Sequence, residues 1–391
     1  MAPTLFGSSA TLLLEASQHG ISQEKKSVPK PELSLSKARS DEKKYKWHVV
    51  WRNVIAFVYI HGAAVYGLYL VFTSAKFASF VTAIAIGVLS GVGITAGAHR
   101  LWAHRAYKAK WPMRMILMIL QTVAFQNHIY EWVRDHRVHH KFTDTDADPH
   151  NAGRGFFFSH MGWLLVRKHP DVVKKGATVD MSDLEKDPII LWQKRLYIIL
   201  MPIFCFLIPT WIPCYFFGEK PINAWYLTLL RYALTLNGTW LVNSAAHIWG
   251  NKPFDKTISP TDSLAVGIGA FGEGWHNYHH VFPWDYKAAE LGNYKGNITT
   301  AFIDMFAWMG QAYDLKTVSV AMVNKRAART GDGSREPRPE KPDQEEDYEG
   351  HHHHHHHHHH DHSHENVVWG WDDKDMAEED MQDAEIYNKG D

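Results

Sequence analysis

The stretch "WRNVIAFVYIHGAAVYGLYLVF", residues 51–72, is apolar enough and long enough to cross a lipid bilayer as one helix. Crossing the hydrocarbon core takes about 20 mostly apolar residues. Three further segments reach this length, at residues 78–98, 197–217 and 224–246. In a helix of a soluble protein, polar residues would recur with a period of 3.6 and so form one polar face. The first three segments lack such a face. We therefore expect an all-α membrane protein with four transmembrane helices.

The distribution of charge predicts the orientation of these helices. Lysine and arginine concentrate before residue 51, between residues 99 and 196, and after residue 247. Cytosolic segments carry the excess of positive charge, so we expect both termini and the long central segment in the cytosol. A further apolar run at 113–125 is too short to span and indicates an interfacial or re-entrant helix.

Composition sets the outer limits of the fold. Residues 1–46 form a polar tail, residues 47–325 the main domain, and residues 326–391 a charged, histidine-rich tail that we expect to be disordered. The net charge of −1 gives no overall attraction to nucleic acid. The two cysteines both lie in one apolar run, which argues against a disulfide scaffold.

Histidines are concentrated in four groups. Nine of the 16 that lie outside the tail occur in "HRLWAH", "HRVHH", "NSAAH" and "HNYHH". Offsets of three and four place each HxxHH group on one face of a helix, and Asn243 and His247 also share a face. His99 and His104 are five residues apart, about 140° around an α-helix, so we expect them to straddle a site wider than one ion.

All nine histidines follow or end a predicted span, or lie in a cytosolic segment, so they are placed to converge beneath one membrane face. One metal ion takes four to six ligands, and nine imidazoles therefore fit two ions. Imidazole suits zinc, copper, iron and nickel alike, so the ligand type does not decide the metal.

The order HxxxxH, HxxHH, HxxHH resembles the histidine boxes of membrane di-iron oxidases. Longer segments, "GITAGAHRLWAHRAYKA" (93–109), "RDHRVHHKFTDTDADPHN" (134–151) and "GEGWHNYHHVFPWDY" (272–286), resemble acyl-CoA desaturases of the stearoyl-CoA (delta-9) type, the insect enzymes among them. The resemblance covers about residues 45–330. It implies a cytosolic helical cap that holds two non-haem iron ions through the following residues, the asparagine acting through water: His99, His104, His136, His139, His140, Asn243, His247, His276, His279 and His280.

The resemblance also implies the reaction. Such enzymes use O₂ and two electrons to introduce a cis double bond into a saturated C16–C18 fatty acyl-CoA in the endoplasmic reticulum membrane. The chain has no dinucleotide-binding fingerprint, and "HPDV" (169–172) lacks the haem-binding HPGG, so the electrons must come from another protein. The resemblance implies that this donor is separate cytochrome b5 with its NADH-dependent reductase. The alternatives are another regioselectivity such as delta-11, a di-iron fatty acyl hydroxylase, and a metal transporter, whose ligands would lie near the mid-membrane.

Substrate contacts follow from the same resemblance. It assigns the CoA head group to Asn53, Asn127, Arg134, Asp135, Arg167, Lys168 and Trp240. It assigns the bend of the acyl tunnel to Gln126, Trp132 and Thr239, and we expect Gly87 and Gly91 to leave room at its end for C18 chains. The four residues "SPTD" (259–262) depart from the usual insect signature, which often ends in glutamate, so delta-11 or another regioselectivity stays open beside delta-9.

Overall fold

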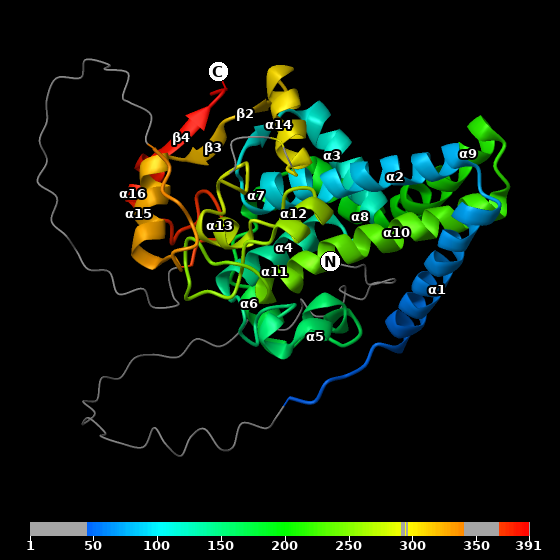
Figure 1. The fold of residues 1–391 in the computed structure, drawn as a ribbon, viewed down its shortest axis with the longest axis horizontal. Helices are drawn as coiled ribbons and strands as arrows, with labels where there is room; N and C mark the ends of the chain where they lie inside the picture. The colour runs from blue at the N-terminus through cyan, green and yellow to red at the C-terminus, as the bar shows by residue number, and fades with distance from the viewer. Residues whose placement is uncertain (1–44, 291–293, 295, 340–366, 391) are drawn as a thin grey trace, which may run out of the picture.

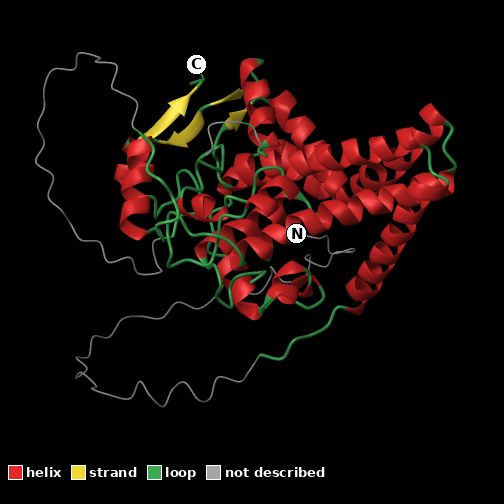
Figure 2. Ribbon diagram, viewed as in Figure 1, coloured by secondary structure: helices red, strands yellow, loops and turns green. Residues whose placement is uncertain are grey.

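The computed structural model describes residues 45–290, 294, 296–339 and 367–390, and they are mostly helical (Figures 1 and 2). The helices are α1 Trp51–Thr73, α2 Phe77–Val92, α3 Trp111–Ala124, α4 Ile129–Lys141, α5 Phe156–His160, α6 Pro170–Gly176, α7 Ser182–Glu185, α8 Pro188–Pro202, α9 Ile208–Phe217, α10 Pro221–Asn243, α11 Ala245–Ile248, α12 Leu264–Gly269, α13 His276–Val281, α14 Ile298–Trp308, α15 Val320–Thr330 and α16 Glu378–Gln382. Two π-helical segments, Gly93–Ala103 and Ile203–Leu207, and two 3₁₀ turns, Ala152–Arg154 and Gly162–Leu164, complete the helical part. The strands pair antiparallel, β1 Lys108–Ala109 with β2 Ala312–Tyr313 and β3 Leu315–Val318 with β4 Ala384–Tyr387.

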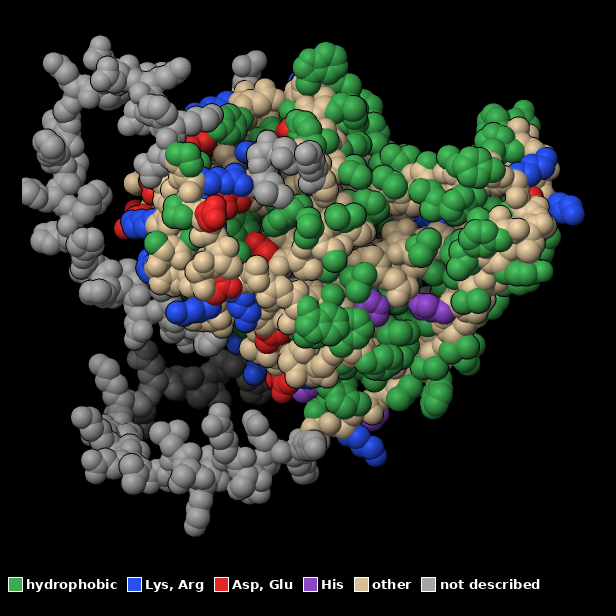
Figure 3. All heavy atoms as spheres, viewed as in Figure 1, with side chains coloured by type: hydrophobic (Ala, Val, Ile, Leu, Met, Phe, Trp, Pro, Cys, Tyr) green, Lys and Arg blue, Asp and Glu red, His purple; other side chains and the backbone are tan. Residues whose placement is uncertain are grey.

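Long helices form one end of the molecule, and short helices, loops and strands form the other (Figure 1). Figure 3 shows hydrophobic side chains gathered over the long helices, whereas most of the visible charged side chains lie over the opposite end. On α1, the apolar side chains of Val58 and Val65 are each 70% exposed and that of Phe72 is 80% exposed. Such exposure is costly in water and is expected of a helix that faces lipid.

Three helical stretches in the described residues are long and apolar enough to cross a membrane: Trp51–Thr73, Phe77–Ala103 and Pro188–Phe217. They coincide with three of the four predicted spans. The second continues beyond the predicted end through His99, and the third begins nine residues earlier than expected.

The fourth predicted span corresponds to α10, a helix of 23 residues that is not apolar enough to be counted with the other three. Its polar residues Asn223, Thr228 and Arg231 are buried against neighbouring helices. A side chain at Gly67 of α1 would lie 2.5 Å from the carbonyl oxygen of Tyr226, so α1 and α10 pack backbone to backbone. The structure supports a helix here, and its passage through the membrane remains a prediction.

The expected disorder of residues 326–391 is wrong for two described parts of this tail. α15 continues to Thr330, and residues 367–390 include α16 and β4, with Leu315 of β3 opposite Tyr387. Two apolar residues of this charged segment, Trp369 and Met376, are buried, with 2% and 6% exposed. The ten consecutive histidines and residues 1–44 lie outside the described residues.

Candidate metal centre

The structure brings all nine predicted histidines together in two buried groups. Each group offers ligand nitrogens that all lie within 4.8 Å of one another. The first group is His99, His104, His136, His140 and His279, and the second is His139, His247, His276 and His280. The histidines come from the π-helical end of the second long helix, from α4, from α11 and from α13.

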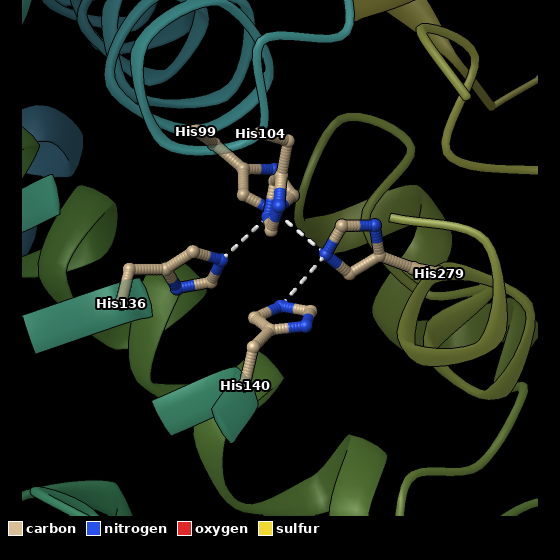
Figure 4. Close-up of side chains that lie close together, drawn as sticks. All are labelled: His99, His104, His136, His140 and His279. Carbon is tan, nitrogen blue, oxygen red and sulfur yellow. Dashed lines mark hydrogen bonds between the residues drawn. The ribbon is translucent and has the colours of Figure 1, made fainter. Parts of the chain in front are cut away.

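The Nε2 atoms within each group face one another. In the first group (Figure 4) the Nε2 atom of His99 lies 2.9 Å from that of His279, which lies 3.1 Å from that of His140. The Nε2 atoms of His104 and His136 are also 2.9 Å apart. In the second group, the Nε2 atom of His276 lies 3.0 Å from that of His247 and 3.2 Å from that of His280. Each group therefore surrounds one point, as ligands of a single ion would.

The expectation that His99 and His104 straddle a site wider than one ion is wrong, because both belong to the first group. Residues 93–103 form a π-helix, in which hydrogen bonds join residues five apart. The amide of His104 accordingly donates to the carbonyl oxygen of His99 at 3.1 Å. The wider helical turn places two residues five apart on the same side, which an α-helix would not do.

Four of the histidines are oriented through their outer nitrogen, Nδ1. In the first group, Nδ1 of His99 lies 2.9 Å from Glu273 Oε2, and Nδ1 of His104 donates to the carbonyl oxygen of Trp369. A carbonyl can only accept, so the proton of neutral His104 sits on Nδ1 and its Nε2 carries a bare lone pair.

In the second group, Nδ1 of His139 lies 3.0 Å from Asp148 Oδ1, and Nδ1 of His247 lies 3.1 Å from Ser259 Oγ. Outer contacts of this kind are typical of metal-binding histidines. Sequence reasoning missed these supporting roles, although Glu273, Asp148 and Ser259 lie within the segments singled out there.

Electrostatics keep the imidazoles in the form that binds metal. Burial, followed by repulsion from neighbouring imidazoles, lowers the pKa of six of these histidines well below the usual value: His104, His136, His140, His276, His279 and His280. Burial and the adjacent His139 lower the pKa of His247 to about 3. At neutral pH these rings are uncharged, and neutral imidazole is the ligating species. Lone pairs that face each other at about 3 Å repel unless a proton or a cation lies between them, so the donor set fits a metal ion at each group.

Glu273 supplies negative charge beside the first group. Burial raises the pKa of its carboxyl group, but Arg100 and His99 outweigh burial and lower the pKa to about 2. Both Nε and Nη2 of Arg100 bond Glu273 Oε1, at 3.1 and 2.7 Å. Glu273 is therefore ionised, and it attracts a cation held by His99.

An apolar cavity of about 480 Å³ leads away from the histidines between α2 and α10. His99, His136, His139 and His276 line it at one end, and Ala83 and Leu234 line it farther along the two helices. Besides these four histidines, five predicted site residues line it: Gly87, Gly91, Trp132, Thr239 and Asn243. The predicted bend residue Gln126 lies beside it, because its Nε2 donates to Thr239 Oγ1 at 2.8 Å and its Oε1 accepts from Trp132 Nε1 at 3.4 Å.

The two tunnel glycines differ in what surrounds them. A Cβ atom at Gly91 would lie 2.2 Å from the ring of Phe271, so the space beside Gly91 is already filled. A Cβ atom at Gly87 would lie 3.3 Å from Arg231 Cγ, which is tight but tolerable. Phe271 therefore occupies part of the space that Gly91 leaves, and the expectation that both glycines make room for C18 chains stays a prediction.

The residues predicted to bind a head group lie outside the cavity lining. Lys168 bonds the buried carboxylate of Asp135 at 2.5 Å, and Nη2 of Arg134 lies 3.6 Å from the same carboxylate. Arg167 is exposed. Asn53 Nδ2 donates to the carbonyl oxygen of Leu164 at 2.7 Å, and Trp240 is fully buried beside α1. Asn127 is buried in the left-handed backbone region, with a φ of 67°.

The segment Ser259–Asp262 does not line the cavity either. Ser259 contacts His247, and Asp262 Oδ1 accepts from the amides of Asn277 and Tyr278 at 2.9 and 3.2 Å. Asp262 thus holds the first turn of α13, which carries three of the nine histidines.

Comparison with known proteins shows which family the chain belongs to. Residues 75–290 match the family model described as fatty acid desaturase. The chain belongs to the fatty acid desaturase family. It is 57% identical to an acyl-CoA Delta-9 desaturase of Acheta domesticus over 390 residues, covering 100% of this chain and 99% of that protein. It is 55% identical to an acyl-CoA Delta12-desaturase of the same organism, covering 90% of each chain. It is 50% identical to an acyl-CoA Delta(11) desaturase of Trichoplusia ni, covering 91% of this chain and 93% of that protein. The predicted kinship with acyl-CoA desaturases is confirmed.

Proposed function

We propose that this protein is an acyl-CoA delta-9 desaturase that introduces a cis double bond into saturated C16–C18 fatty acyl-CoA. One observation carries the proposal: the apolar cavity between α2 and α10 begins at both histidine groups. A long hydrocarbon chain is the ligand that such a cavity favours, since burial of each methylene is worth about 0.8 kcal/mol. Selectivity for position on a featureless chain then follows from the depth at which the chain stops.

The two histidine groups are proposed to hold two iron ions, with Asn243 contributing through water. Asn243 supports this role because it lines the cavity together with His139 and His276. The irons would supply O₂ activation and hydrogen abstraction from unactivated methylenes, which no acid or base of the protein can perform. The protein holds the ligands neutral and oriented, and Trp132 and Thr239 confine the chain beside them.

The head group is proposed to lie against the polar surface of α4 and the segment that follows the turn Gly162–Leu164. Lys168 and Arg134 are tied to Asp135 there, whereas Arg167 is exposed and offers its guanidinium to a CoA phosphate. Asn53, Asn127 and Trp240 complete the proposed contacts.

In the proposed topology α10 is the fourth span, the short helices form a cytosolic cap, and the enzyme resides in the endoplasmic reticulum membrane. The buried polar face of α10 supports this, because a helix that packs inside a bundle need not be apolar all round. Cytochrome b5 and its NADH-dependent reductase are the proposed source of electrons, and O₂ the oxidant.

Double-bond mapping in desaturase-deficient yeast tests the proposal. Identity does not separate the regioselectivities, since the Delta-9 and Delta12 relatives differ by only two percentage points in identity to this chain. We expect new monounsaturated C16 and C18 lipids with the bond at carbon 9. A bond at carbon 11 or 12 would correct the regioselectivity alone, while hydroxylated products or no product from expressed, iron-loaded protein would refute desaturation.

A further inference from the structure

The short loop Trp369–Trp371, here the WGW loop, contacts one metal-ligand candidate at two points. The carbonyl oxygen of Trp369 accepts from Nδ1 of His104. The amide of Trp371 donates to the carbonyl oxygen of His104 at 2.9 Å. The loop therefore fixes both the ring and the backbone of His104, although it lies 265 residues farther along the chain.

The residue between the two tryptophans fits only as glycine. A Cβ atom at Gly370 would lie 2.5 Å from the carbonyl oxygen of His104 and 2.7 Å from its Cα atom. These are backbone atoms at the end of a packed π-helix, so they cannot move aside as a flexible side chain would. Any side chain at residue 370 pushes the loop away from His104.

The indole of Trp369 also contacts the helix that carries the first HxxHH group. The guanidinium of Arg137 stacks on this ring at 3.9 Å from its centroid. The same guanidinium donates to the carbonyl oxygens of Trp102 and Ala103 at 2.8 and 3.0 Å. One buried arginine thus joins the WGW loop, α4 and the last turn before His104.

The loop is anchored independently of His104. The carboxylate of Asp373 accepts from the amide of Trp369 at 2.9 Å and pairs with Lys141 at 2.7 Å. Val368, Trp371 and Met376 pack into an apolar cluster with Tyr278 and Phe282, which belong to α13 or adjoin it. The position of the loop therefore does not depend on His104, and the loop can hold His104 in place.

We propose that the WGW loop is a positioning element of the five-histidine group. Its Trp369 carbonyl holds the proton of His104 on Nδ1 and directs the bare Nε2 lone pair at the metal. The inference deepens the proposed function and rests on it, since it requires that the five-histidine group holds a metal ion. The C-terminal segment is then part of the active centre, and its loss weakens one metal site and leaves the four-histidine site in place.

Titration of the metal-free, full-length protein with Co²⁺ tests this inference, with bound ions counted by mass spectrometry and followed by visible absorption. The parent protein is expected to bind two ions. Gly370→Ala is expected to weaken one of the two sites by about 10- to 100-fold, the usual effect of losing an outer contact of a metal-binding histidine. Trp369→Phe retains the carbonyl and an aromatic face for Arg137, and it is expected to keep both sites.

Two matched variants control for general damage. Tyr387→Ala removes a half-exposed side chain from β4 of the same segment without touching His104, and Gly62→Ala adds a Cβ atom where no heavy atom lies within 4 Å. Both are expected to bind two ions with parental affinity. Unchanged binding in Gly370→Ala would overturn the inference, and so would equal weakening of both sites, which would make the loop a general structural element. A parent protein that binds fewer than two ions would instead refute the proposed di-metal site.

Discussion

A substitution at residue 87 tests whether the cavity limits the length of the acyl chain that the enzyme accepts. Gly87 of α2 lines the cavity opposite α10, between the histidine end and Ala83. Gly87→Leu adds four carbon atoms to the wall, and its first atom meets only Arg231 Cγ at 3.3 Å and Thr235 Oγ1 at 3.7 Å. The substitution is therefore expected to shorten the cavity without displacing the backbone.

The size of the effect follows from the hydrocarbon that is excluded. If the four new carbon atoms displace about four methylenes, the loss is roughly 3 kcal/mol at about 0.8 kcal/mol for each methylene. Since 1.4 kcal/mol corresponds to a factor of ten, the preference for C18 over C14 chains is expected to fall by roughly a hundredfold. C14 chains are expected to react at nearly the parental rate, because a shorter chain occupies less of the cavity.

A competition assay measures this preference. Microsomes containing the parent or the variant receive equal C14 and C18 acyl-CoA, and the unsaturated products are separated by gas chromatography. Gly62→Leu is the matched control, since a Cβ atom at this position of α1 meets nothing within 4 Å. An unchanged C18 to C14 ratio in Gly87→Leu, with normal iron content, would show that the acyl chain does not run along this wall.

Three further substitutions probe the supporting residues. Asp148→Ala removes the acceptor from His139 Nδ1, so we expect the four-histidine site to bind metal about 10- to 100-fold more weakly in the same Co²⁺ titration; parental affinity would contradict this role. Burial raises the pKa of the Asp262 carboxyl from 3.8 to about 7, so ionisation costs stability as pH rises between these values, up to roughly 4 kcal/mol. Asp262→Asn is therefore expected to unfold at a higher temperature than the parent at pH 8 and to lose this advantage at pH 4, and an advantage that does not grow with pH would refute it. Arg167→Ala is expected to raise KM for acyl-CoA up to about fivefold at low salt without changing kcat, since an exposed ion pair is worth up to about 1 kcal/mol; an unchanged KM would place the head group elsewhere.

The sequence was sufficient to predict the features that depend on local periodicity. Hydrophobic length located the helices around residues 51–72, 78–98 and 197–217, and offsets of three and four identified the HxxHH faces. These features depend on residues close together in the chain, so a pattern reports them directly. Hydrophobic length also located the helix near residues 224–246. Its buried polar residues make it less apolar than the other three, so its composition alone does not indicate a membrane span.

Features that depend on packing between distant segments were missed. The spacing of His99 and His104 predicts opposite sides of an α-helix, but residues 93–103 form a π-helix. The histidine spacing itself does not indicate this wider turn. Gly93 indicates the constraint, since a Cβ atom there would lie 2.4 Å from the backbone of Leu120 and Gln121.

The tail shows the same limit. Its composition indicates disorder, yet Trp369 is buried because Arg137 and His104, far away in sequence, provide its partners. Composition averages over a segment and cannot identify the few residues that pack.

If two separate ions lie within the nine imidazoles, a metal count on active protein will find both. Purified enzyme of measured turnover is analysed by inductively coupled plasma mass spectrometry for iron, zinc, copper and nickel per chain. We expect two iron ions per active chain, with turnover proportional to iron content. Full turnover with one iron or none, or with another metal in its place, would contradict it.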